Sequence, residues 1–155
     1  MNKKCVVVIP VYLSDLSGIC LASFRQALNV LKKYDITLVT YEELDISKYK
    51  EVAYCCGKTI QAEYFDKDFF SSVAGYNRLC LSTQFYERFA DYSYMLIYQL
   101  DAWVFYDNLE VWCDKGYDYI GPPLFHILNI TPPFTHTVVK ALVMEDFRCV
   151  KYHIA

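Results

Sequence analysis

Long apolar runs are missing from this chain of 155 residues. The longest one covers residues 5–11, far below the roughly 20 residues that are needed to cross a bilayer. The amino terminus also lacks the charged start and long apolar segment of a signal peptide. We therefore expect a protein without a transmembrane segment that works in the cytoplasm.

Basic residues are not in excess. The 15 lysines and arginines are outnumbered by 18 aspartates and glutamates, which leaves a formal net charge of -3. Such a chain has no positive field that would attract a phosphate backbone. Nucleic acid is therefore excluded as an expected partner.

Two common nucleotide-binding motifs and the C-x-x-C pair are absent. The first apolar strand ends in Pro10-Val11-Tyr12 without a glycine-rich phosphate cradle, so neither a dinucleotide fingerprint nor a Walker loop is present. The 7 cysteines are odd in number, and most of them lie within apolar patterns. We expect reduced, buried thiols that behave as small hydrophobic residues.

The chain does contain ample material for one globular core, because 55% of its residues are hydrophobic and 21% are charged. Residues 5–9 form a β-branched run without polar alternation, which is typical of a strand covered on both faces of a parallel sheet. Four apolar residues then recur at helical spacing: Leu21, Phe24, Leu28 and Leu31. With a second strand at residues 36–40, this is a βαβ unit. The sequence thus predicts an α/β fold with a Rossmann-like, mostly parallel sheet flanked by helices.

After residue 40 the pattern of apolar residues predicts helices and strands less clearly. Residues 41–58 are polar and predict a connection with a short edge strand at 52–56. Further strands are expected at residues 61–65, 94–100 and 117–120. Helical turns are expected over residues 69–89, with a break near Ser82, and a short helix over residues 108–115 closed by Gly116.

Asp101 follows directly after the expected strand at residues 94–100. A carboxylate in that place is costly to desolvate unless it is solvated, paired or bound to a cation. It either caps the turn that follows or provides a hard oxygen ligand for Mg²⁺ or Mn²⁺. In an open parallel sheet, ligands bind beyond the carboxyl ends of the strands. Asp101 and the Pro10-Val11-Tyr12 segment are therefore the two candidate site segments.

Four segments of the chain resemble a poorly characterised bacterial family of glycosyltransferase-A-like proteins. These are GYNRLCLS at residues 75–82, FYERF at 85–89, YMLIYQLDA at 94–102 and GYDYIGPP at 116–123. The opening strand is similar too, and the resemblance covers residues 3–125. It implies a fold of the glycosyltransferase-A type and the transfer of a sugar from a nucleotide-diphosphate donor to a hydroxyl of a glycan or surface polysaccharide.

The resemblance also implies site residues, although it assigns no catalytic one. The nucleotide-binding set is Pro10, Val11, Tyr12, Asn77, Arg78 and Gln99. Asp101 is the implied ligand of Mn²⁺ or Mg²⁺, which would accompany the diphosphate. The fork of the Arg78 guanidinium suits phosphate oxygens, but a surface arginine beside a helix-capping asparagine explains the same pair equally well.

The chain departs from the family pattern in two places. Trp103 stands where a D-x-D motif has its second acid, and Asp107 is expected to lie too far along the chain to replace it. Residues 126–155 contain all three histidines and no glycine, so a G-G-F-S-type segment and an acceptor-binding half are not found there. We therefore divide the chain into a nucleotide-sugar-binding part at residues 1–125 and a divergent tail at 126–155, and we expect the fold to be incomplete.

Three hypotheses follow for the function. The chain is a fragment of a glycosyltransferase, a non-catalytic α/β module that binds a nucleotide or a partner chain, or a nonfunctional truncated remnant. A histidine metal site is disfavoured, because spacings of 10 and 17 residues match no ordinary ligand pattern.

Overall fold

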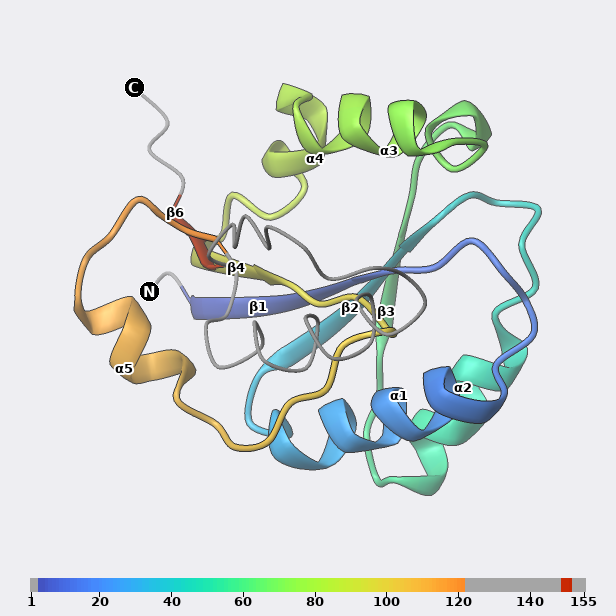
Figure 1. Cartoon of the computed structure of the whole chain (residues 1–155), viewed down its shortest axis with the longest axis horizontal. Helices are drawn as coiled ribbons and strands as arrows, with labels where there is room; N and C mark the ends of the chain where they lie inside the picture. The colour runs from blue at the N-terminus through green and yellow to red at the C-terminus, as the bar shows by residue number, and fades with distance from the viewer. Residues whose placement is uncertain (1–2, 122–148, 152–155) are drawn as a thin grey trace, which may run out of the picture.

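A computed structural model describes residues 3–121 and 149–151, and a six-stranded sheet with the order β3-β2-β1-β4-β6-β5 lies at its centre (Figure 1). The strands are β1 (Lys3–Pro10), β2 (Asp35–Thr40), β3 (Gln61–Tyr64), β4 (Tyr92–Ile97), β5 (Tyr119–Ile120) and β6 (Cys149–Lys151). The strands β3, β2, β1 and β4 are parallel, whereas β6 runs antiparallel to both β4 and β5.

Short helices connect these strands. They are α1 (Gly18–Val30), α2 (Ser47–Cys55), the 3-10 turn η1 (Lys67–Phe69), α3 (Val73–Cys80), α4 (Thr83–Glu87) and α5 (Leu109–Asp114). The helices α1 and α2 cover one face of the sheet, and α3 and α4 cover the other (Figure 1). The predicted α/β architecture with a Rossmann-like parallel sheet is therefore confirmed.

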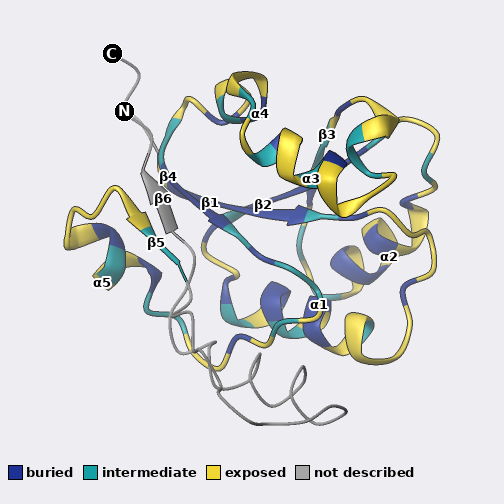
Figure 2. Ribbon diagram, turned by 45° about the horizontal axis from the view of Figure 1, so that its top comes forward, coloured by how far each residue is buried: buried dark blue, intermediate teal, exposed yellow. Residues whose placement is uncertain are grey.

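The central strand β1 is buried on both faces. Val7 and Ile9 pack into the core beneath α1 and α2, while Val6 and Val8 pack into the core beneath α3 and α4, and all four side chains are fully buried. This explains why the strand has no polar alternation, since neither face meets water. In Figure 2 the central strands are accordingly buried, and exposed residues lie on the outer sides of the helices.

The two cores differ in composition. The α1 and α2 side is mostly aliphatic and contains Phe24, Ala27 and Leu28 from α1. The α3 and α4 side is richer in aromatic residues, and the ring of Phe85 lies 5.9 Å from that of Phe65 and 5.8 Å from that of Phe89. Edge-to-face and tilted ring pairs of this kind add to the stabilisation from burial.

The expected strand-helix-strand unit forms as predicted, since β1, α1 and β2 follow one another and β1 pairs with β2 in parallel. The expected strand at residues 52–56 is wrong, because these residues belong to the end of α2 and the turn that follows it. The buried residues of α2 are Tyr49, Val52 and Ala53. Val52 and Ala53 lie three and four positions after Tyr49, so all three side chains lie on one face of the helix. One further candidate element in the sequence, at residues 138–144, lies outside the described residues.

The expectation for the cysteines is only partly correct. Among the described residues no disulfide is formed, and Cys5 and Cys113 are buried as expected. Cys20 and Cys55, however, are exposed, because they lie on the outer sides of α1 and α2. No helix in the described part of the chain is long and apolar enough to cross a membrane.

Candidate functional site

The order of the parallel strands reverses between β1 and β4. From β1 the chain builds outward through β2 to β3, and it then returns to place β4 on the other side of β1. The helices that follow β1 and precede β4 lie on opposite faces of the sheet (Figure 1). In open α/β sheets this arrangement leaves a ligand crevice at the carboxyl ends of the two strands. The candidate site is therefore the edge formed by the ends of β1 and β4.

At the end of β1, the three predicted nucleotide-binding residues have different environments. Pro10 is the last residue of the strand and is half-buried. The Val11 amide donates to the Val39 carbonyl at 2.9 Å, and the Val11 side chain is buried in the core. Tyr12 is 59% exposed, so it is the member of the trio whose side chain reaches solvent. A ligand at this edge would meet the Tyr12 ring and the backbone of the other two residues.

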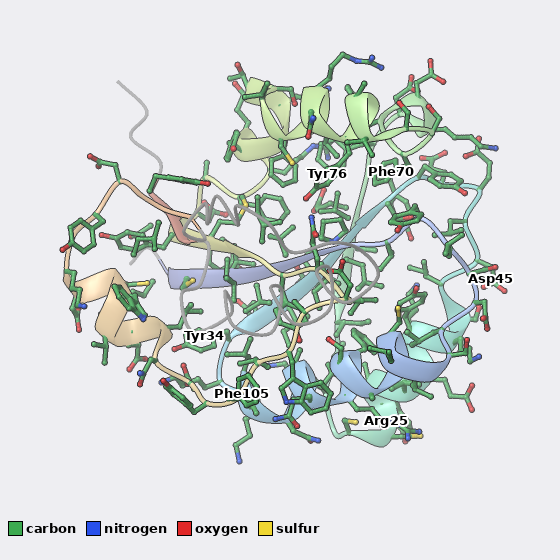
Figure 3. The ribbon with its side chains drawn as sticks, viewed as in Figure 1. Arg25, Tyr34, Asp45, Phe70, Tyr76 and Phe105 are labelled. Carbon is green, nitrogen blue, oxygen red and sulfur yellow. The ribbon has the colours of Figure 1, made fainter. Side chains whose placement is uncertain are left out.

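The helix α3 is joined to the same edge through Gln99. The Gln99 side-chain amide donates to the Tyr76 hydroxyl at 3.4 Å, and Figure 3 shows Tyr76 on the side of α3 that faces the sheet. Asn77 and Arg78 are the next residues of α3, and both side chains are exposed. The structure thus places Gln99 at the edge itself and leaves Asn77 and Arg78 on the solvent side of the neighbouring helix.

Asp101 lies in a turn rather than at the end of a strand. The strand β4 ends at Ile97, three residues earlier than expected, although the Tyr98 amide still donates to the Val8 carbonyl at 2.9 Å. The chain then reverses, because the Ala102 amide donates to the Gln99 carbonyl at 2.9 Å. Asp101 is the third residue of this turn, and its side chain is exposed.

The turn is attached to α1 by partly buried hydrogen bonds. The Ser23 hydroxyl of α1 donates to the Ala102 carbonyl at 2.5 Å, and the Tyr98 hydroxyl reaches the same carbonyl at 3.0 Å. Two residues further on, the Gln26 side-chain amide donates to the Val104 carbonyl at 2.9 Å. Burial raises the pKa of the Tyr98 hydroxyl above its usual value, so this group keeps its proton to higher pH than an ordinary tyrosine does.

Asp107 belongs to a different cluster. Its carboxylate accepts from the Tyr34 hydroxyl at 3.0 Å and from the Leu109 amide at 3.1 Å, and it pairs with the Lys33 ammonium at 3.0 Å. Burial, and then the Asp107 carboxylate, raise the pKa of the Tyr34 hydroxyl. These contacts tie the end of α1 to the start of α5, so Asp107 has a structural role there.

The neighbouring strand β2 brings aromatic residues to the same edge of the sheet. Tyr41 follows directly after β2, and its ring centroid lies 5.6 Å from that of Phe70. The Lys67 ammonium lies 5.3 Å from the centre of the Tyr41 ring. These residues were not among the predicted site residues, although two signals in the sequence point to them: an aromatic residue immediately after a buried strand and the Phe69-Phe70 pair.

The described residues fit a metal ion only in a limited way. Nowhere in residues 3–121 and 149–151 do three histidine, cysteine, aspartate or glutamate side chains gather as a metal-binding group. Asp101 would supply a single carboxylate. Mg²⁺ is commonly held by one or two carboxylates together with substrate phosphates and water, so one exposed aspartate is compatible with a metal that arrives with a diphosphate. The three histidines lie outside the described residues.

By its fold, the chain is an α/β protein with a Rossmann-like sheet whose strand order reverses between β1 and β4. It belongs to the family described as "Protein of unknown function (DUF5672)", whose profile matches residues 59–144. The matched stretch includes Asn77, Arg78, Gln99 and Asp101 and begins after β1 and β2. It also runs past residue 125, and the division of the chain at that residue stays a prediction. No curated protein matches the chain.

Proposed function

We propose that the chain binds a nucleotide-diphosphate sugar, together with Mn²⁺ or Mg²⁺, at the edge formed by β1 and β4. The observation that carries this proposal is the position of Asp101, an exposed carboxylate on an ordered turn at the point where the strand order reverses. The crevice outside such a point is where open α/β sheets bind their ligands. The activity that this site supports best is sugar transfer to a hydroxyl of a glycan or surface polysaccharide.

The residues at the edge divide into three roles under this proposal. The Tyr12 ring and the backbone of Pro10 and Val11 contact the base and ribose, and Gln99 lies between them and α3. Arg78 and Asn77 lie on the solvent side of α3, and under this proposal they contact a diphosphate that extends from the edge along that helix. Asp101 holds the metal, which when bound would stabilise the negative charge on the departing diphosphate.

A binding module without turnover is the second candidate. The observation that favours it is the residue pattern of the turn, in which Trp103 takes the place of a second acid and Asp101 alone remains. A site of this kind would bind the nucleotide and would not cleave it. Release of the nucleoside diphosphate from a panel of sugar donors, with and without mixed glycan acceptors, distinguishes the two functions.

The binding site itself is tested by calorimetry with uridine diphosphate and guanosine diphosphate. We expect weak binding in the presence of Mn²⁺ or Mg²⁺ and none after addition of a chelator. The substitution Asp101→Asn should abolish the metal dependence, because it removes the charge that pairs with the cation. Asp91→Asn is the matched control, since Asp91 is also an exposed aspartate in a turn but precedes β4 at its amino end.

Two results would contradict the proposal. Equal nucleotide binding with and without chelator would remove the metal from the site. Equal loss of binding in Asp101→Asn and Asp91→Asn would show that the effect does not come from the β1/β4 edge. Asp107→Asn should also retain the metal dependence, because Asp107 is engaged with Lys33 and Tyr34 instead.

A further inference from the structure

Two buried hydroxyl groups meet the turn that carries Asp101. Ser23 of α1 is fully buried, and Tyr98 is 2% exposed. Their oxygens lie 2.7 Å apart, and both lie within hydrogen-bond distance of the Ala102 carbonyl. Ala102 is the residue directly after Asp101, so the turn is held on the side that faces the core.

Ser23 and the turn that it contacts come from distant parts of the chain. Ser23 lies on a helix face whose other buried members are Phe24, Ala27 and Leu28. A hydroxyl in that apolar face needs a partner, because a buried polar group without a hydrogen bond is costly. The Ala102 carbonyl provides this partner, and Tyr98 shares it. The polar residue in α1 is thus explained by the turn that it contacts.

The number of hydroxyl protons limits how many of these hydrogen bonds can form at once. Ser23 and Tyr98 have one hydroxyl proton each, so at most two of the three short contacts are hydrogen bonds at any moment. With both protons directed at the Ala102 carbonyl, the two lone pairs of that oxygen are filled. Gln26 adds a separate bond to the Val104 carbonyl, so the chain is fixed to α1 on both sides of Trp103.

We infer that Ser23 and Tyr98 are positioning residues that hold the Asp101 turn in the conformation needed for metal and diphosphate binding. Both side chains are buried, so neither hydroxyl is available to a ligand at the surface of the turn. Their effect on binding passes through the backbone of residues 99–102. The role assigned to Asp101 rests on the proposed function, whereas the attachment of the turn to α1 can be tested without any ligand.

The ligand-free test uses tryptophan fluorescence. The chain has two tryptophans, so the substitution Trp112→Phe leaves Trp103 as the single fluorescent probe. Trp103 directly follows Ala102, whose carbonyl accepts the hydrogen bonds from Ser23 and Tyr98. In this background, Ser23→Ala combined with Tyr98→Phe should raise the acrylamide quenching constant of Trp103 and lower its anisotropy. Val52→Ala on α2 is the control, because it truncates a buried side chain of another helix and should leave both signals unchanged.

The binding test is calorimetry with uridine diphosphate and Mn²⁺. Ser23→Ala with Tyr98→Phe should weaken metal-dependent binding by at least about tenfold, the lower end of the roughly 10–100-fold loss that follows removal of an outer-shell partner at a metal site. Val52→Ala should lower Tm and leave the affinity unchanged, because it truncates a buried side chain of another helix. The comparison of the two variants separates positioning of the turn from general destabilisation.

The outcomes distinguish the two proposals. If wild type shows no metal-dependent binding, the proposed function fails, and the fluorescence result alone decides whether the turn is held by α1. If wild type binds and Val52→Ala weakens binding as much as the hydroxyl variants do at equal loss of Tm, the positioning role is overturned. Unchanged quenching of Trp103 in the hydroxyl variants also overturns it.

Discussion

Tyr49 shows how one buried residue makes stability depend on pH. Its hydroxyl donates to the Leu13 carbonyl at 2.9 Å and thereby joins α2 to the segment after β1. Burial raises the pKa of this hydroxyl to about 12, compared with 10.0 for an ordinary tyrosine. Between these values the folded chain keeps a proton that the unfolded chain has lost, so the free energy of unfolding decreases as the pH rises from about 10 to 12.

The contribution of Tyr49 is therefore fully present below pH 10 and lost at strongly alkaline pH. We expect Tyr49→Phe to be less stable than wild type at pH 8 and the difference to shrink at about pH 11. Urea unfolding at both pH values measures this difference. Tyr54→Phe is the control, since Tyr54 lies on the same helix and is 83% exposed. A gap between wild type and Tyr49→Phe that stays constant with pH would show that burial does not perturb this hydroxyl.

The residues of the candidate site were predictable to different degrees. Asp101 could be selected because an acid after an apolar strand needs an explanation, and the structure does place it at the switch point. Ser23 could not be selected, because its partner Ala102 lies 79 positions away in the sequence and offers only a backbone carbonyl. A single serine on an apolar helix face indicates that a partner exists and does not identify it.

At the scale of elements, burial overrode local composition in α2. The segment around Lys48, Lys50 and Glu51 is polar, and sequence composition favoured a connection there. Three buried side chains on one face were enough to keep it helical against α1, since helices in proteins are stabilised mainly by packing of one face. By contrast, β1 and α1 were predictable because their apolar patterns are long and unambiguous.

The helix α3 contains a glycine that its contacts require. A methyl group at Gly75 would overlap the backbone carbonyl oxygen of Asp68 and would lie 3.0 Å from that of Phe69. The helix therefore packs directly against the backbone of η1. Glycine inside a helix normally costs about 1 kcal/mol relative to alanine, so its presence here reflects the close approach.

We expect Gly75→Ala to lower the free energy of unfolding by about 1–3 kcal/mol, because neither backbone can move easily. An unhindered helix position would give the opposite sign, a gain of about 1 kcal/mol. Val73→Ala serves as the control, since Val73 is 78% exposed on the same helix and should tolerate the change. Urea denaturation measures both variants. A stabilised Gly75→Ala protein would disprove the close contact between α3 and η1.

At the scale of the whole molecule, the strand β6 completes the sheet. It pairs with β4 through Met95 and Val150 and with β5 through Tyr119 and Val150, so it lies between two strands. The three residues of β6 come from the range 126–155, and they occupy an interior place in the sheet. Without them the edge of β4 would be unpaired, and unpaired edges promote association between chains.

This arrangement makes Val150 a sensitive position for the assembly of the sheet. Proline has no amide hydrogen and is essentially confined to edge strands and bulges, so Val150→Pro should disrupt the pairing of β6. We expect this variant to lose several degrees in Tm, given that 1 kcal/mol corresponds to roughly 2–4 °C for a chain of this size. It should also bind more hydrophobic dye and elute partly as dimers or larger species in size-exclusion chromatography with light scattering.

Val150→Thr is the matched control. It keeps the amide hydrogen and the branched side chain that suits a strand, so its Tm and its elution should remain close to those of wild type. If Val150→Pro and Val150→Thr have the same Tm and both stay monomeric, β6 does not complete the sheet, and the edge of β4 must be protected in another way.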